Sequence, residues 1–106
     1  MNEKYLGLIL HHSIYYLLGY LKVKAKMTIE IKAVKEAVSL LGGQSKLARK
    51  IGVTQGAVWK WVNGLKKISP ENAVLIVEAT NGAVQAHELR PDLPKVFPPP
   101  TEVDNE

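Results

Sequence analysis

The stretch "GGQSKLARKIGVTQGAVWKWVNG" occupies residues 42–64 and carries four Lys or Arg residues and no acid. Its apolar residues have helical spacing in two groups that meet at Gly52. A glycine directly after a short helix is typical of the left-handed backbone that a Cβ would strain. Thr54 can then cap a second helix, which Gly64 ends. The stretch therefore predicts helices over residues 44–51 and 55–63, joined by a tight turn.

Two short helices joined in this way have the layout of a helix-turn-helix. Ala48 is small, as it must be where the second helix crosses closely, while Val58 and Trp61 anchor that helix to the core. The remaining inward-facing residues of the stretch are apolar as well: Leu47, Ile51 and Val53.

The segment before this stretch predicts another helix. Ile31, Val34, Val38 and Leu41 step by three, four and three residues, which places them on one helical face. We expect Thr28 to be the N-cap, with Glu30 in the first turn, and the glycine pair at 42–43 to end the helix.

The segment after the stretch predicts a fourth helix and a short fifth one. Ser69 is a suitable N-cap, Pro70 suits the first helical position, and Asn81-Gly82 ends the helix. Its apolar residues are numerous enough to be buried on more than one side: Ala73, Val74, Ile76 and Val77. "AVQAHEL" can add one or two turns before Pro91, so the sequence predicts an all-α domain of four or five helices.

Charge is distributed unevenly along the chain. Net charge is +4 over 106 residues, made up of +3 over residues 1–26, +6 over 27–67 and −5 over 68–106. The basic middle third indicates a polyanionic partner. The absence of cysteine fits a reducing compartment, and the 66 residues from Met27 to Asp92 are few for a lone core, which favours dimerisation.

The first 26 residues differ from the rest because they are nearly continuously apolar from Tyr5 to Leu21. This run is short for a membrane span and lacks a signal-peptide cleavage site. Three interpretations stay open: an upstream extension added by start-codon choice, a membrane or lipid-surface anchor, and a helix that binds a partner. Residues 94–106 are Pro-rich and then acidic, which predicts an extended or disordered tail.

The segment "QSKLARKIGVTQGAVWKWVNG" resembles the helix-turn-helix of Cro/CI-type phage repressors, and "ISPENAVLIVEATNGAVQAHELRPDL" is similar to their YdaS-like, Cro-like antitoxin branch. The resemblance covers about residues 29–93. It implies a lambda-repressor-like fold and a phage or prophage repressor that binds operator DNA as a homodimer in the cytoplasm, at the nucleoid. Two positions depart from the family pattern: Trp59 stands where a small polar residue is usual, and Gly56 leaves a gap.

Helix geometry assigns the outward face of the third helix independently of the resemblance. At 100° per residue, Trp59, Lys60, Asn63 and Gly56 point away from the core, and Gln55 lies at the flank of the first turn. Gln can bond adenine and Lys can bond guanine in the major groove, while Trp can pack on a thymine methyl group. The predicted base-reading residues are Gln55, Gly56, Trp59, Lys60 and Asn63.

Phosphate contacts are expected mainly from the amide end of the second helix, where the helix dipole favours an anion. Basic side chains on either side can add to them. The predicted phosphate-binding residues are Gln44, Ser45, Lys46, Arg49, Thr54, Lys66 and Lys67.

Three other function classes compete with a repressor: an antitoxin, an enzyme, and a DNA-binding protein tethered to a membrane through residues 5–21. An antitoxin would neutralise a toxin protein through the fourth helix and the acidic C-terminal region while the helix-turn-helix regulates its own promoter. An enzyme is disfavoured, because the chain has three His residues, no Cys and no Gly-rich phosphate loop. We expect no cofactor, no metal and no membrane partner, and His87 reads as a helix-surface residue.

Overall fold

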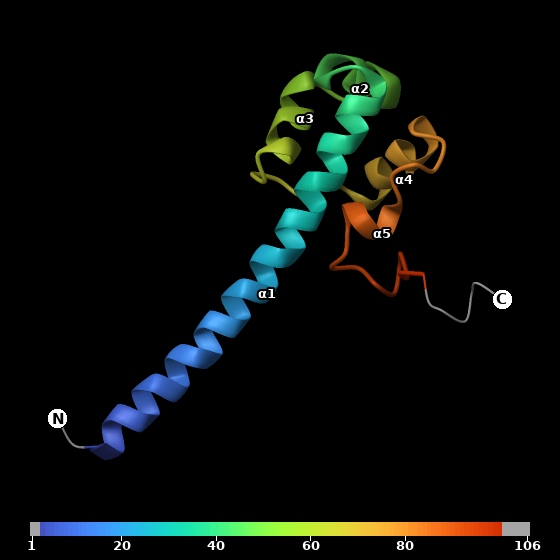
Figure 1. Ribbon diagram of the computed structural model, residues 1–106. Coiled ribbons are helices and arrows are strands. Elements are labelled where there is room, and N and C mark those ends of the chain that lie inside the picture. Colours follow the sequence, from blue (N-terminus) through green and yellow to red (C-terminus); the bar gives the residue numbers. More distant parts are fainter. Residues whose placement is uncertain (1–2, 101–106) are drawn as a thin grey trace.

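A computed structural model describes residues 3–100 of the chain, with side chains at 16–22 and 24–100. The five helices are α1 (Glu3–Leu41), α2 (Gln44–Ile51), α3 (Gln55–Val62), α4 (Pro70–Ala79) and α5 (Ala86–Leu89). The part of the chain that is described contains no strand, so the all-α prediction is confirmed. The second half of α1 packs with the other helices, while its first half projects away from them (Figure 1).

Helix α1 does not begin at Thr28, and the prediction of an N-cap there is wrong. The helix runs without a break from Glu3, and the Thr28 hydroxyl donates to the carbonyl of Lys24 at 2.9 Å. Residues 22–27 contain neither Gly nor Pro, so nothing stops the helix before the packed segment. The side chains from Lys24 to Ile29 are exposed, and the proposed domain boundary at residue 27 stays a prediction.

No helix of the described residues is long and apolar enough to cross a membrane. Large apolar side chains on the projecting part of α1 are nevertheless exposed, among them Leu17, Leu18 and Leu21.

One core joins all five helices. The buried side chains of α1 are Ala33, Val34 and Ala37, while the predicted Ile31, Val38 and Leu41 are half-buried at the edges of that face. Helix α4 buries Ala73 and Ile76 but exposes Val74, so it is buried on one side only. The remaining buried apolar residues are Leu47, Ala48, Ile51, Val58, Trp61, Ile68, Val84 and Leu89.

The predicted helix ends are confirmed by their hydrogen bonds. Gly52 adopts the left-handed conformation with φ 79°, and its N–H donates to the carbonyl of Ala48. The hydroxyl oxygen of Thr54 accepts from the N–H of Ala57 at 3.1 Å, and that of Ser69 accepts from Asn72 at 3.2 Å. These caps fix where α3 and α4 begin.

The C-terminal segment is more ordered than its composition suggests. Residues 91–97 form turns in which the carbonyl of Leu93 accepts from the N–H groups of Val96 and Phe97, and Phe97 packs against the core. The prediction of an extended or disordered tail is therefore wrong for residues 94–97, because one aromatic side chain gains burial there. Residues 101–106 lie outside the described part of the chain.

A charged cluster ties the end of α5 to α1 and to the loop after α3. The Arg90 guanidinium donates to both carboxylate oxygens of Asp92 at 2.9 Å and to the carbonyl of Ile68 at 2.7 Å. The Lys67 amine lies 3.3 Å from Asp92 and 3.3 Å from Glu30. The hydrogen bond to Arg90 and that to Lys67 hold the pKa of Asp92 well below its usual range.

We expect Asp92→Asn to lower the free energy of unfolding by about 1–3 kcal/mol at pH 7, because Arg90 and Lys67 lose a charged partner. The pKa of Asp92 is depressed in the folded chain, so its contribution is complete above the unfolded pKa of about 4 and fades as the pH falls below it. The difference between the wild type and Asp92→Asn should therefore stay constant from pH 7 to about pH 5 and shrink as the pH falls from there to about 2 in urea titrations. Glu78→Gln, an exposed carboxylate on α4, is the control. Equal stability of the wild type and Asp92→Asn at pH 7 would contradict this account.

Candidate nucleic-acid interface

Helices α2 and α3 form the frame of the candidate interface. The left-handed turn at Gly52 redirects the chain within two residues, and buried Ala48 leaves room for α3 beside α2. Val58 and Trp61 are buried on the inner face of α3, as predicted. With that face fixed in the core, the opposite face of α3 is turned to solvent.

The structure places the five predicted base-reading residues on this outward face. All five are exposed, and Trp59 retains 47% of its surface. The members of the set are Gln55, Gly56, Trp59, Lys60 and Asn63.

A side-chain hydrogen bond links the first turns of α2 and α3. The Gln55 Nε2 donates to the Gln44 Oε1 at 2.8 Å. Sequence reasoning placed Gln44 among the phosphate contacts and did not foresee this bond. Periodicity gives no signal for it, because the bond depends on how the first turns of α2 and α3 lie relative to each other in the folded chain. The bond restricts the orientation of the Gln55 amide at the front of α3.

Asn63 is engaged in a different way. Its Nδ2 donates to the carbonyl of Trp59 at 2.8 Å, and its backbone forms the C-cap of α3. The amide therefore adds a second hydrogen bond to a carbonyl that already accepts from the Asn63 N–H at 3.1 Å. One donor hydrogen and the amide oxygen remain for a ligand.

The predicted phosphate-binding residues divide into two groups. Ser45, Lys46, Arg49, Thr54 and Lys66 are exposed, and Gln44 is half-buried. Lys67 is exposed too, but its amine lies between the carboxylates of Glu30 and Asp92. A phosphate would have to compete with both carboxylates for Lys67.

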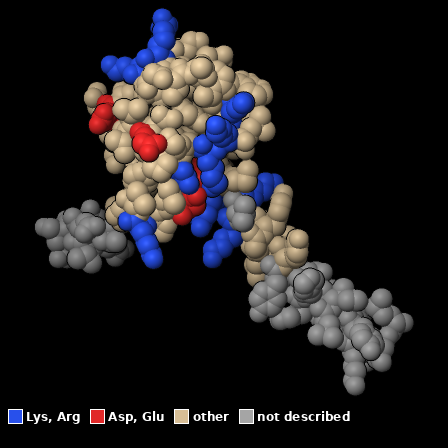
Figure 2. All heavy atoms as spheres, turned by 180° about the vertical axis from the view of Figure 1, so that it is seen from behind, with Lys and Arg blue, Asp and Glu red and all other residues tan. Residues whose placement is uncertain are grey.

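The electrostatics of this region favour an anion. Residues 37–70 contain five Lys and one Arg but no Asp or Glu. The N-cap of α2 is Gly43, whose lack of a side chain leaves the first amides of α2 without a side-chain cap. Seen from behind, Lys and Arg side chains gather in a band over the molecule (Figure 2).

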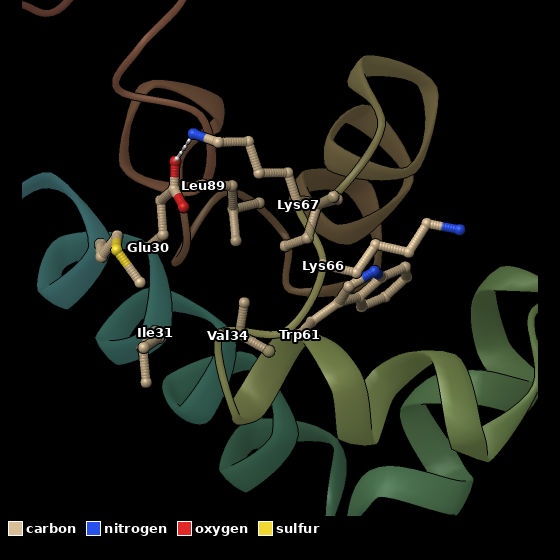
Figure 3. A pocket seen from close by; sticks show the side chains of 10 residues that line it. Glu30, Ile31, Val34, Trp61, Lys66, Lys67 and Leu89 are labelled. Carbon is tan, nitrogen blue, oxygen red and sulfur yellow. Dashed lines mark hydrogen bonds and ion pairs between the residues drawn. The ribbon is translucent and has the colours of Figure 1, made fainter. Parts of the chain in front are cut away.

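A small cavity lies on the inner side of α3. It measures about 90 Å³ and has apolar walls from Ile31, Val34, Trp61, Ile68 and Leu89. Figure 3 shows the Glu30–Lys67 ion pair beside it. Ligand pockets are typically several times larger, at about 300–1,000 Å³, so the cavity is better suited to packing than to binding a metabolite.

Comparisons with known proteins cover this whole region. Residues 34–96 match the model of a family described as "Bacterial toxin YdaS". A protein of Escherichia coli (strain K12), named "Putative transcriptional regulator YdaS", is 39% identical over 67 residues, which make up 63% of this chain and 68% of that protein. No solved structure matches the chain. The chain therefore belongs to the YdaS family.

Proposed function

We propose that the protein is a transcriptional regulator that binds operator DNA as a homodimer and represses by occluding a promoter. The observation that carries this proposal is the outward face of α3, where Gln55 is oriented by Gln44 within a helix-turn-helix. The name of the E. coli relative supports a regulatory role. A helix of this kind reads base edges from the major groove.

Gln55 suits adenine because of what the bond to Gln44 leaves free. One of its two Nε2 hydrogens is donated to Gln44, so one hydrogen and the Oε1 remain. Adenine presents an N7 acceptor and an N6 donor in the major groove, which match this remaining pair. In the proposed complex, the bond to Gln44 helps to orient the Gln55 amide toward adenine.

Lys60 and the α2 end supply the other polar contacts. Lys60 is exposed one turn after Gly56 and can donate to guanine or to a phosphate. The open amides at the start of α2, with Ser45, Lys46 and Arg49, suit the phosphates on one side, and Lys66 suits those on the other. We assign Lys67 a weaker role, since its amine is already paired.

A homodimer suits this reading face because an eight-residue α3 spans few base pairs, and a two-fold axis doubles the contacts. Exposed Val74 and Leu75 on α4 are the proposed contact surface. The segment "AVQAHELRPDL" offers less apolar surface for such a contact, because Val84 and Leu89 are fully buried in the core.

Gln55→Ala should weaken binding to an operator with adenine at the contacted position by about 1–3 kcal/mol, because the bidentate contact is lost. Gln44→Ala should weaken binding less, since it removes only the orientation of Gln55. The measurement is a fluorescence titration of the full chain against a duplex enriched from a random pool and against a scrambled duplex. Lys95→Ala, at an exposed site in the C-terminal turns, is the control. If the wild type enriches no sequence from the pool, the proposal fails.

Salt dependence tests the phosphate contacts separately. With about four to six phosphates neutralised per dimer, log K should fall with log salt at a slope of about −4 to −5. Lys46→Ala combined with Arg49→Ala removes four charges per dimer, so the slope should become shallower by about 3.6 units, equally for all sequences. An unchanged slope would exclude these two residues from the phosphate contacts.

The family description, "Bacterial toxin YdaS", names a toxin and not an antitoxin, so the second candidate function rests on the acidic C-terminal end of the chain. In it, the protein is the antitoxin of a pair and binds a toxin protein through α4 and its acidic C-terminal end. Deletion of residues 98–106 tests this while leaving Phe97 in the core. Unchanged DNA binding with loss of a partner that co-purifies from the native host would support it, and retention of all partners would exclude this role for the tail.

A further inference from the structure

Nothing in the described fold explains why residue 56 is a glycine. Of the five glycines between residues 42 and 64, the other four have positive φ angles, between 68° and 139°. Gly56 lies in the first turn of α3 and is not among the residues with positive φ. A glycine in regular helix lowers stability compared with alanine.

Steric crowding does not explain Gly56 either. A Cβ added there would meet only the Thr54 Oγ1, at 3.9 Å, which is an ordinary van der Waals distance. At Gly64, by contrast, an added Cβ would come within 3.0 Å of Ile31. The fold would therefore accept alanine at position 56, and the space beside Gly56 on the protein surface stays open.

The open space beside Gly56 lies on the face of α3 that a ligand would approach. Taking the inward direction as the mean of Val58 and Trp61, Gly56 lies within about 10° of the opposite direction at 100° per residue. It is thus the point of the first turn that comes closest to a ligand on the outward face. Trp59 follows by three residues on the same side and is half exposed. Helical side chains lean toward the N-terminus, and no indole atom lies within 4 Å of a Cβ added at Gly56, so Trp59 does not fill the space beside this glycine.

We propose that Gly56 and Trp59 form a slot that receives the C5-methyl group of an operator thymine and makes this position specificity-determining. This inference rests on the proposed function. The methyl group of thymine is the apolar group that standard bases present in the major groove. The indole offers it an apolar wall, and the missing Cβ of Gly56 leaves it room. Gln55 and Lys60 beside the slot contact the neighbouring bases.

The test uses the full chain and the duplex that it enriches from a random pool. Each thymine is replaced singly by deoxyuridine, which pairs identically but lacks the methyl group. One replacement per half-site should weaken wild-type binding by about threefold to tenfold. Replacing the same base pair by C·G should weaken it too, and 5-methylcytosine at that site should restore part of the loss.

The variants connect this effect to the slot. Gly56→Ala should raise the melting temperature by about 2–5 °C while weakening operator binding, because it favours the helix but fills the space. In Gly56→Ala and Trp59→Ala, the deoxyuridine replacement should change affinity by less than about twofold. Gly19→Ala is the matched control, since that glycine is exposed on α1 with nothing within 4 Å of its added Cβ, and it should leave binding unchanged.

The outcomes separate the two proposals. If a sequence is enriched but no deoxyuridine replacement weakens binding, the slot is wrong while the regulator remains. The same holds if Gly56→Ala binds the operator as well as the wild type, or if the variants keep the full deoxyuridine effect. If no sequence is enriched, the proposed function fails and the slot with it.

Discussion

Burial of Val58 and Trp61 is the constraint on which the candidate interface depends. These two side chains fix the rotation of α3 about its axis, and the outward positions of Gln55, Trp59 and Lys60 follow from helical geometry alone. The turn at Gly52 and the small Ala48 allow α2 to lie close enough for this packing. A helix of only eight residues has little stability by itself, so its face is defined by the core beneath it.

The charged cluster around Asp92 extends this constraint to the rest of the chain. Helix α5 has four residues and cannot be stable alone, yet Leu89 is fully buried. The Arg90 side chain reaches the carbonyl of Ile68, and Lys67 reaches Glu30, so the loop after α3 is held between α1 and α5. The Lys67 amine is paired in these same contacts. A basic residue next to the helix-turn-helix therefore stabilises the fold here and is less available for a phosphate.

Local rules predicted most of the fold, because the helix ends of α2, α3 and α4 depend on residues close in sequence, such as Thr54 and Ser69. The start of α1 was missed because a suitable cap at Thr28 does not stop a helix when the preceding residues also favour it. The outward face was predicted by periodicity. The Gln44–Gln55 bond and the role of Arg90 were not, since both depend on distances across the fold.

Gly56 shows what the structure adds to a motif. From sequence it was a gap in the expected reading face, and it cast doubt on readout at that position. The structure removes the two usual reasons for a helical glycine, namely a positive φ and a close neighbour. Gly56 lowers the stability of the helix, and no contact within the described fold compensates for this. A ligand that binds outside the fold is the better explanation for the glycine. In the proposed slot, the ligand approaches the backbone closely at this outward point of the first turn of α3, beside the exposed indole of Trp59.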